Sequence, residues 1–394
     1  MKFGKLAFLT TLTLSGVLPM PVRVAAQNVS SKISAFDAPG ASSAAGSFDG
    51  TFPKSINDTG AITGHYVDGN TLYHGFLRNR EGDFITLDAP GEGTSVGFRF
   101  GTLPNNIAIS SSITINNRGT ITGNYVDSNH VTHAFVRSAA GQFVTFDAPG
   151  ASATAGSFDG TFPASINDGG SITGSYIDSK QLTHGFLRTP AGAFSTVDAP
   201  GAGAVAAAGY GTFPRSINDR GAITGHYTDA HGVIHGFLRG PVGEFTAFDA
   251  PGTSSAAAFG YGTFPESIND AGAIAGHYTD AHGLIHGFVR SPGGKVTTFD
   301  APGASTVAAF GYGILPHSIN NAGAIAGHYI DAHGLTHGFV RSPGGTLTAF
   351  DAPGAGATAA SGYGTFPESI NNAGVITGHY TDTGGLIHGF IRSP

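Results

Sequence analysis

Aspartate and histidine recur along this sequence at spacings that could support acid–base chemistry or metal binding. A Tyr-x-Asp motif is followed six residues later by a histidine, and fourteen residues after the histidine stands the aspartate of an Asp-Ala-Pro-Gly motif. Carboxylates and imidazoles carry protons and bind divalent metals. The set recurs seven times, with the last aspartate at the N-terminus, and its members include Asp68, His74 and Asp88; Asp229, His235 and Asp249; and Asp280, His286 and Asp300.

Two interpretations of this Asp-His-Asp set are open. The functional one is a metal site or an acid–base pair. The structural one is a hydrogen-bonded cluster that fixes loops and strand register. A catalytic site is needed once, whereas a building block recurs, so we expect a structural role. We predict no cofactor, with a divalent metal held by these sets as the alternative.

Aromatic and imidazole side chains mark the loops of only some repeats. An Asp-Ala-His-Gly motif supplies His231, His282 and His333, and a Gly-Tyr-Gly motif supplies Tyr210, Tyr261, Tyr312 and Tyr363. Aromatic rings on glycine-rich loops suit the faces of sugars or peptides. We predict that these residues bind a ligand on one face of the fold. The alternative is that the rings pack between repeats.

Two further recurring side chains are expected to be structural. A Gly-His-Tyr motif carries a histidine that we expect to be buried between repeats, at His65, His226, His277, His328 and His379. An arginine follows each His-Gly-Phe or His-Ala-Phe motif after one residue. We expect it to cover an aromatic ring or to pair with an acid of a neighbouring repeat.

The elements that position these residues follow from an internal repeat of about 51 residues. The Ile-Asn dipeptide recurs seven times at that spacing, except that eight extra residues, around 106–113, lengthen the first interval. In the fifth copy, four short β-branched or aromatic runs cover residues 265–269, 273–280, 284–290 and 296–301, separated by Gly, Pro, Asn and Asp. Four antiparallel strands repeated seven times predict an all-β fold, a seven-bladed β-propeller with four-stranded blades, and the alternative is a β-solenoid or another repeat array.

The two chain ends predict how the ring closes. The sequence stops after the third strand of the seventh repeat, and residues 33–40 match the missing fourth strand. We expect this N-terminal strand to pair with the last blade, which would leave no open sheet edge at the junction.

The repeat also resembles a known family. The pattern I-N-x-x-G-x-I-x-G-x-Y, followed by His-Gly-Phe or by the His-Ala-Phe of residues 133–135, is similar to the HAF repeat of bacterial extracellular proteins. The resemblance covers nearly all of residues 27–394. It implies an exported bacterial repeat protein and no defined activity.

Composition and the N-terminus bear on the compartment. Residues 1–26 combine Lys2 and Lys5 with an apolar run and end in Ala25 and Ala26, which is typical of a secretory signal peptide. A retained anchor is the alternative. Residues 27–394 then form a single domain, secreted or periplasmic, with no later membrane span. The sequence has no Cys, so it forms no disulfides. Its net charge of −7, without a basic stripe, argues against nucleic acid as a partner.

Three functions fit these observations. We expect a monomeric, non-enzymatic module that binds a saccharide or an extracellular protein. The first alternative is an extracellular hydrolase or lyase that uses an Asp/His site near the central channel. The second is a structural cell-surface protein. The sequence contains no G-x-S-x-G, H-E-x-x-H, P-loop or EF-hand motif, which favours the binding module.

Overall fold

The computed structural model describes residues 32–44, 47, 49–93, 113–157, 159–205, 209–256, 260–307, 312–357 and 362–394. Residues Ser31–Pro394 form one compact unit. Its regular secondary structure in these ranges is β-strand, and none of them contains a helix long and apolar enough to cross a membrane. The predicted insertion at residues 106–113 lies outside the described ranges except for Ile113, which is buried.

The strands form successive groups of four. Group 1 is β2 (Thr51–Ile56), β3 (Ile62–Val67), β4 (Tyr73–Arg78) and β5 (Phe84–Leu87); group 2 is β6 (Thr114–Ile115), β7 (Ile121–Val126), β8 (Thr132–Arg137) and β9 (Phe143–Phe146); group 3 is β10 (Thr161–Ile166), β11 (Ile172–Ile177), β12 (Thr183–Arg188) and β13 (Phe194–Thr196); group 4 is β14 (Gly211–Ile217), β15 (Ile223–Thr228), β16 (Ile234–Arg239) and β17 (Phe245–Phe248); group 5 is β18 (Thr263–Ile268), β19 (Ile274–Thr279), β20 (Ile285–Arg290) and β21 (Val296–Phe299); group 6 is β22 (Ile314–Ile319), β23 (Ile325–Ile330), β24 (Thr336–Arg341) and β25 (Leu347–Phe350); group 7 is β26 (Gly364–Ile370), β27 (Ile376–Thr381), β28 (Ile387–Arg392) and β1 (Ile33–Phe36).

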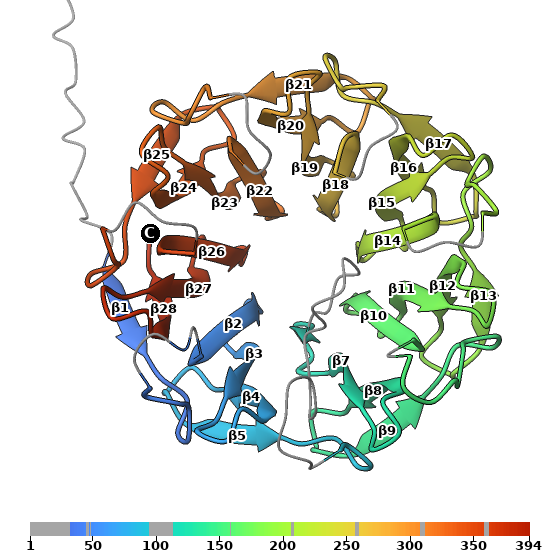
Figure 1. Ribbon diagram of the computed structural model, residues 1–394, viewed down its shortest axis with the longest axis horizontal. Coiled ribbons are helices and arrows are strands. Elements are labelled where there is room, and N and C mark those ends of the chain that lie inside the picture. Colours follow the sequence, from blue (N-terminus) through green and yellow to red (C-terminus); the bar gives the residue numbers. More distant parts are fainter. Residues whose placement is uncertain are drawn as a thin grey trace, which may run out of the picture. The chain divides into compact units, whose positions relative to one another are not determined.

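Within each group the strands pair antiparallel in chain order. Single parallel bridges, Thr183↔Gly211 and Thr336↔Gly364, join groups 3 and 4 and groups 6 and 7 into eight-stranded sheets. In group 7 the fourth position is taken by β1, which pairs with β28 from Ile33↔Arg392 to Phe36↔Gly389. The predicted pairing of the N-terminal strand with the last repeat is therefore confirmed. The groups follow one another around a central opening, with the first strand of each nearest to it (Figure 1).

Tight turns join the first and second strands of each group. In group 1 the N–H of Gly60 donates to the carbonyl of Asn57 at 3.0 Å, and Gly60 takes a φ of +86°, a conformation that glycine adopts without strain. The Asn57 carboxamide oxygen accepts the N–H of Ala61 at 2.9 Å. A short polar residue followed by glycine therefore fixes the hairpin.

The same asparagines link neighbouring groups. The Asn57 side-chain amide donates to the backbone carbonyl of Asn116 in group 2 at 3.0 Å. Equivalent bonds of 2.9–3.0 Å continue from group to group and return to Asn57; their donors are Asn116, Asn167, Asn218, Asn269, Asn320 and Asn371. The chain of bonds is closed, so every group is held by the one before it and the one after it.

The hydrophobic core lies between successive groups. Ile62 and Phe76 of group 1 are essentially inaccessible to solvent and pack with Phe36 of β1 and Ile391 of β28. Gly64 lies so close to the neighbouring strand that a Cβ would meet the Phe52 carbonyl oxygen at 2.1 Å. This close approach explains why glycine recurs in the second strand. The sheets stack face to face, and side chains on these faces build a core cluster at each junction, with two at the junction of groups 3 and 4.

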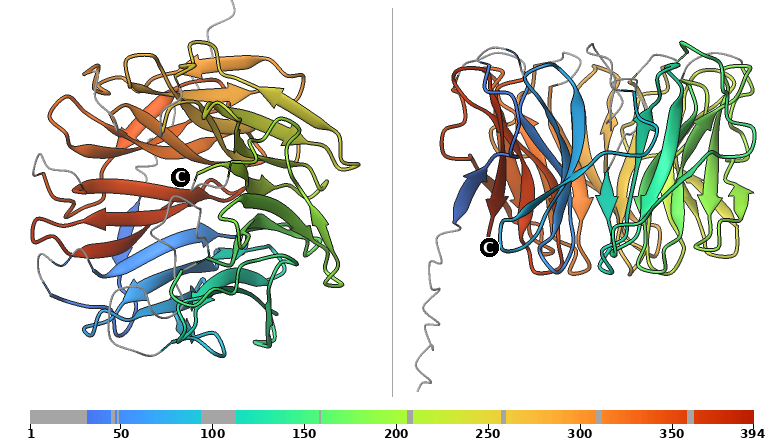
Figure 2. Two further views of the ribbon diagram at one scale, coloured as in Figure 1. Left: turned by 45° about the vertical axis from the view of Figure 1, so that its right-hand side comes forward. Right: turned by 90° about the horizontal axis from the view of Figure 1, so that it is seen from below.

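The loops and turns lie at opposite ends of the strands. Isolated bridges such as Ala304↔Asp331 place the connection that leaves the fourth strand beside the loop between the second and third strands. The turn after the first strand lies at the other end (Figure 2, right). We call the first end the loop face and the second the turn face.

Candidate functional site

The Asp-His-Asp sets assemble as predicted. In all seven, the histidine Nδ1 lies 2.8–3.0 Å from the Asp-Ala-Pro-Gly carboxylate. The histidine Nε2 lies 3.5–3.7 Å from the Tyr-x-Asp carboxylate. Asp68, His74 and Asp88 thus come together from three consecutive strands of one group. The imidazole also stacks on Tyr66, with ring centroids 5.0 Å apart.

Local bonds already occupy the first aspartate of each set. Asp68 Oδ1 accepts the backbone N–H groups of Asn70 and Leu72 at 2.8 and 2.9 Å, which shapes the loop between β3 and β4. Although burial opposes the shift, these hydrogen bonds and His74 lower the pKa of Asp68. The hydrogen bond to Asp88 raises the pKa of His74 against the effect of burial. The contacts favour the structural interpretation of the set.

The geometry also limits metal binding. Because the two aspartates face opposite nitrogens of the ring, one ion cannot contact all three side chains. Among the described residues, the group of three ligand-type side chains whose atoms lie within 4.8 Å of one another is His74, Asp88 and Glu92. Glu92 belongs to the first repeat alone, since the other repeats carry alanine or threonine there. In the first set Glu92 also accepts the N–H of Ala89 at 3.2 Å.

The two expectations for structural side chains hold. The Gly-His-Tyr histidines lie between groups; His379 stacks on Phe366 of its own group and lies 5.4 Å from the ring of Phe52 in group 1. Within the described ranges, five of the strand-end arginines cover an aromatic ring of the preceding group, as when the Arg188 guanidinium lies 4.6 Å from the Phe146 ring centroid. Arg137 instead lies 5.8 Å from the ring centroid of Phe143 in its own group. Aromatic cover, the first of the two expected roles, is therefore what the structure shows.

On the loop face, the histidines of groups 4, 5 and 6 are exposed. The N–H groups of His231, His282 and His333 each donate to the Tyr-x-Asp aspartate of the same group at 2.8 Å. The Tyr-x-Asp aspartate therefore has two roles: it lies beside the histidine of the Asp-His-Asp set, and it fixes the backbone of the loop that carries the exposed imidazole.

The loop tyrosines precede the first strands of groups 4 to 7, and one of them, Tyr312, approaches a histidine loop. Tyr210, Tyr261, Tyr312 and Tyr363 are half-buried. In group 6, the Tyr312 hydroxyl lies 3.5 Å from the position of a Cβ on Gly334, the residue after His333. The Tyr312 carbonyl accepts the N–H of Ile285 in group 5 at 2.9 Å. The tyrosine backbone thus joins two groups, while its hydroxyl reaches the histidine loop, so both interpretations of the tyrosines have contacts in their favour.

A third candidate, which the sequence analysis missed, lies at the centre. A cavity of about 290 Å³ is lined by the first strands, including Lys54, Arg215, Glu266, His317 and Glu368. We call these five residues the charged belt. Each stands at the x of a Pro-x-Ser-Ile segment; group 3 carries Ala164 there, and group 2 has Ser-Ile-Thr-Ile at residues 112–115 in place of the segment. The signal was present in the sequence: in the six repeats that have this segment, the x position changes its charge while Pro, Ser and Ile stay constant.

A β-bulge turns the belt residues inward. In group 1 the register shifts between Pro53 and Ser55, which leaves Lys54 without a partner on β3. The same shift occurs in the first strands of groups 3 to 7. Bulges re-aim side chains and are common beside functional sites.

Three of the five belt residues have a close partner. Lys54 Nζ lies 2.6 Å from Glu368 Oε1, and His317 Nε2 lies 3.0 Å from His328 Nδ1. Burial alone would raise the pKa of Glu368, but Lys54 and the nearby histidines lower it to about 2. Burial, followed by the charge of Lys54, lowers the pKa of His379 to about 3. Arg215 and Glu266 are farther apart, at 3.9 Å.

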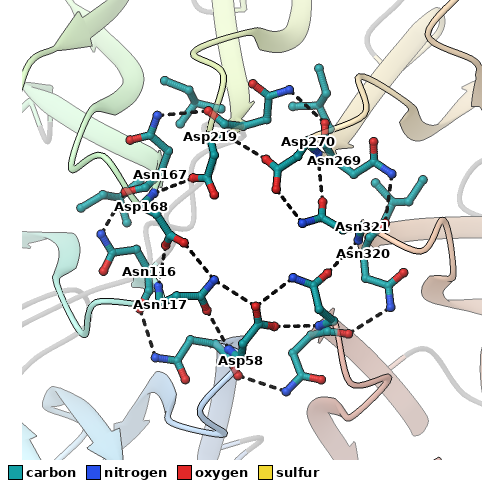
Figure 3. Close-up of a pocket in the computed structure, with 18 of the residues that line it drawn as sticks. Asp58, Asn116, Asn117, Asn167, Asp168, Asp219, Asn269, Asp270, Asn320 and Asn321 are labelled. Carbon is teal, nitrogen blue, oxygen red and sulfur yellow. Dashed lines mark hydrogen bonds between the residues drawn. The ribbon is translucent and has the colours of Figure 1, made fainter.

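Polar residues ring the turn-face mouth of the centre (Figure 3). Each backbone N–H donates to the side-chain Oδ1 of the next member at 2.7–2.9 Å, and the bonds close on themselves. The members of this mouth ring are Asp58, Asn117, Asp168, Asp219, Asp270, Asn321 and Asn372. Burial, with Asp168 and Asp270 on either side, raises the pKa of Asp219. The mouth cavity, of about 180 Å³, shares Ile115 and Ile166 with the belt cavity.

No protein-family model matches the chain, and no curated protein does. Similar solved structures include a six-bladed β-propeller lectin of Aleuria aurantia that recognises fucose, with 14% identity, 81% of this chain and 94% of that chain covered, and a TM-score of 0.42. A lectin of Burkholderia pseudomallei has 11% identity, coverage of 85% and 95%, and a TM-score of 0.45. A puromycin hydrolase has 13% identity, coverage of 84% and 50%, and a TM-score of 0.46. At these identities and TM-scores, the likenesses decide neither the ligand nor the number of blades.

Proposed function

We propose that this protein is an exported, non-enzymatic seven-bladed β-propeller that binds a saccharide on its loop face. The seven four-stranded groups, the closed chain of asparagine bonds and the pairing of β1 with β28 support the blade count. The signal-like residues 1–26 support export, and the repeat pattern supports membership of the HAF-repeat family.

The observation that carries the proposal is the exposed imidazole at the same point of groups 4, 5 and 6, which in group 6 belongs to a loop that the hydroxyl of Tyr312 approaches. His231, His282 and His333 are held at the same point of three consecutive groups by the same hydrogen bond. A sugar offers hydroxyl groups to imidazole nitrogens and C–H faces to tyrosine rings. Three equal sites side by side would bind a branched or repeating saccharide with avidity.

The test is a glycan array followed by calorimetry on residues 27–394. The double variant Tyr261→Ala/Tyr312→Ala and the triple variant His231→Ala/His282→Ala/His333→Ala are each expected to weaken binding of the best glycan by about tenfold or more, with unchanged thermal unfolding. The matched control is Tyr363→Ala, because group 7 keeps the tyrosine and has no histidine in the adjacent loop. It is expected to bind like the wild type.

Two results would count against the proposal. Unchanged affinity of the double and triple variants would remove the loop face as the saccharide site. Absence of any glycan binding, together with capture of a purified extracellular protein that depends on the same tyrosines, would replace the saccharide by a protein partner.

A further inference from the structure

The central cavity contains an ion pair that is not in hydrogen-bonding contact. Arg215 Nε lies 3.9 Å from Glu266 Oε2, beyond the reach of a direct hydrogen bond. Arg215 Nε is buried and has no hydrogen-bond partner among the described residues. Both side chains line the cavity of about 290 Å³. A guanidinium and a carboxylate thus face one space with their bonding capacity largely unused.

Glu266 has one further neighbour, since its Oε1 lies 3.8 Å from His277 Nδ1, a buried atom without a hydrogen-bond partner among the described residues. Burial lowers the pKa of His277 to about 3, so this imidazole adds no charge near neutral pH. Lys54 and Glu368 neutralise each other at 2.6 Å, and His317 is hydrogen-bonded to His328. Beyond Arg215 the cavity wall is formed by small or uncharged residues of groups 2 and 3, among them Thr114 and Ala164. The free charges are therefore one positive and one negative group side by side, with space next to them.

The mouth ring selects against free anions. Four of its seven members are aspartates and three are asparagines, and they surround the turn-face entrance (Figure 3). The field of several carboxylates around an opening repels an anion and admits a cation or a molecule of zero net charge. A simple anion at Arg215 would also face the carboxylate of Glu266, and a simple cation at Glu266 would face Arg215.

We propose that the central cavity binds a small zwitterion of the α-amino-acid class. The ligand carboxylate is bound by the Arg215 guanidinium, and its ammonium group by the Glu266 carboxylate. Such a ligand inserts into the open ion pair, replaces one long contact by two charge-assisted hydrogen bonds and leaves the charge of the cavity balanced. The cavity volume restricts the ligand to small members of the class. This site is separate from the loop face and goes beyond the proposed saccharide function.

The test is calorimetry on residues 27–394 with glycine and alanine, compared with the half-ligands acetate and ethylamine. We expect the amino acids to bind at least about tenfold more tightly than either half-ligand, since each lacks one charge-assisted contact. Arg215→Gln and Glu266→Gln are each expected to weaken alanine binding by about tenfold or more. Glu244→Gln, in the turn between β16 and β17, is the matched control and is expected to change nothing.

Each contrary result has a defined meaning. If acetate binds as tightly as alanine, this is an anion site, and if ethylamine binds as tightly as alanine, it is a cation site. Either result overturns the proposal. Absence of glycine and alanine binding at millimolar concentrations overturns it as well. If a variant unfolds, protection of β14 and β18 amides from hydrogen exchange by alanine in the wild-type protein tests the site directly. The triple histidine variant of the loop face is expected to keep full alanine binding, which separates failure of this site from failure of the proposed saccharide site.

Discussion

The side-chain amide of Asn371 donates a hydrogen bond to the backbone carbonyl of Asn57 at 3.0 Å, although the two residues are 314 positions apart in the sequence. This bond joins group 7 to group 1. Asn371 also accepts the N–H of Val375 at 2.9 Å through its carboxamide oxygen, so one buried side chain both shapes its turn and closes the chain of asparagine bonds.

We expect Asn371→Ala to lower the free energy of unfolding by about 1–3 kcal/mol, because it leaves the N–H of Val375 without its partner and removes one of the two hydrogen bonds that the Asn57 carbonyl accepts. Urea denaturation measures this loss. The neighbouring Asn372→Ala removes an exposed member of the mouth ring and is expected to cost clearly less. Equal losses would mean that the closed chain of asparagine bonds contributes no more to the free energy of unfolding than ordinary surface contacts.

Removal of β1 is expected to destabilise the protein and promote association. Deleting residues 27–36 exposes the edge of β28 and removes Phe36 from the core and from beneath the Arg78 guanidinium, 4.8 Å away. An unpaired strand edge is a template for pairing with another chain. Light scattering after gel filtration should show oligomers, while deletion of residues 27–31 alone should leave a monomer. A monomeric 27–36 deletion with an unchanged melting temperature would contradict closure by β1.

The buried histidines are expected to make the protein sensitive to mild acid. Burial lowers the pKa of His277 and His379 to about 3, well below the ordinary value of 6.5. Between these values the unfolded chain binds protons that the folded protein does not. The contribution of these histidines to the free energy of unfolding is therefore fully present above about pH 6.5. It falls as the pH drops toward 3, by up to about 1.4 kcal/mol per pH unit for each histidine.

The matched variant is His379→Asn, since the second repeat carries Asn124 at the equivalent position. Urea midpoints measured from pH 7.5 to 4.5 should fall less steeply for this variant than for the wild type. His74→Asn should not make this loss of stability toward low pH less steep, because the pKa of His74 is raised in the folded protein. Its contribution to the free energy of unfolding is present below the pKa of the unfolded chain and is lost as the pH rises through the pKa of the folded protein. An equally steep loss of stability toward low pH in His379→Asn would refute the assignment.

Divalent metals are expected to leave the Asp-His-Asp sets unaffected. The two carboxylates of a set lie at opposite nitrogens of the ring, so they cannot share one ion with it. Thermal unfolding with zinc, calcium or a chelator should be unchanged within about 1 °C. A metal-dependent shift that disappears in Glu92→Ala would instead assign binding to His74, Asp88 and Glu92.

The Asp-His-Asp sets and the hairpins could be predicted from the sequence because the residues involved are close together along the chain. His74 is six residues from Asp68 and fourteen from Asp88, and two tight loops bring the carboxylates to 3.7 and 3.0 Å from the imidazole nitrogens. Glycine and asparagine at the turns and β-branched residues between them specify the strands locally. The pairing of β1 with β28 could be predicted as well, since a repeat split between the two ends has one complementary partner.

The charged belt depended on tertiary structure. Lys54 and Glu368 are 314 residues apart, and nothing in either segment indicates that they form an ion pair at 2.6 Å. Their meeting requires the groups to close around one centre and a bulge to turn the residue after each proline inward. Local sequence determines the shape of one repeated unit. The set of side chains that share the central space is decided when the units pack, because those contacts join residues that no local periodicity relates.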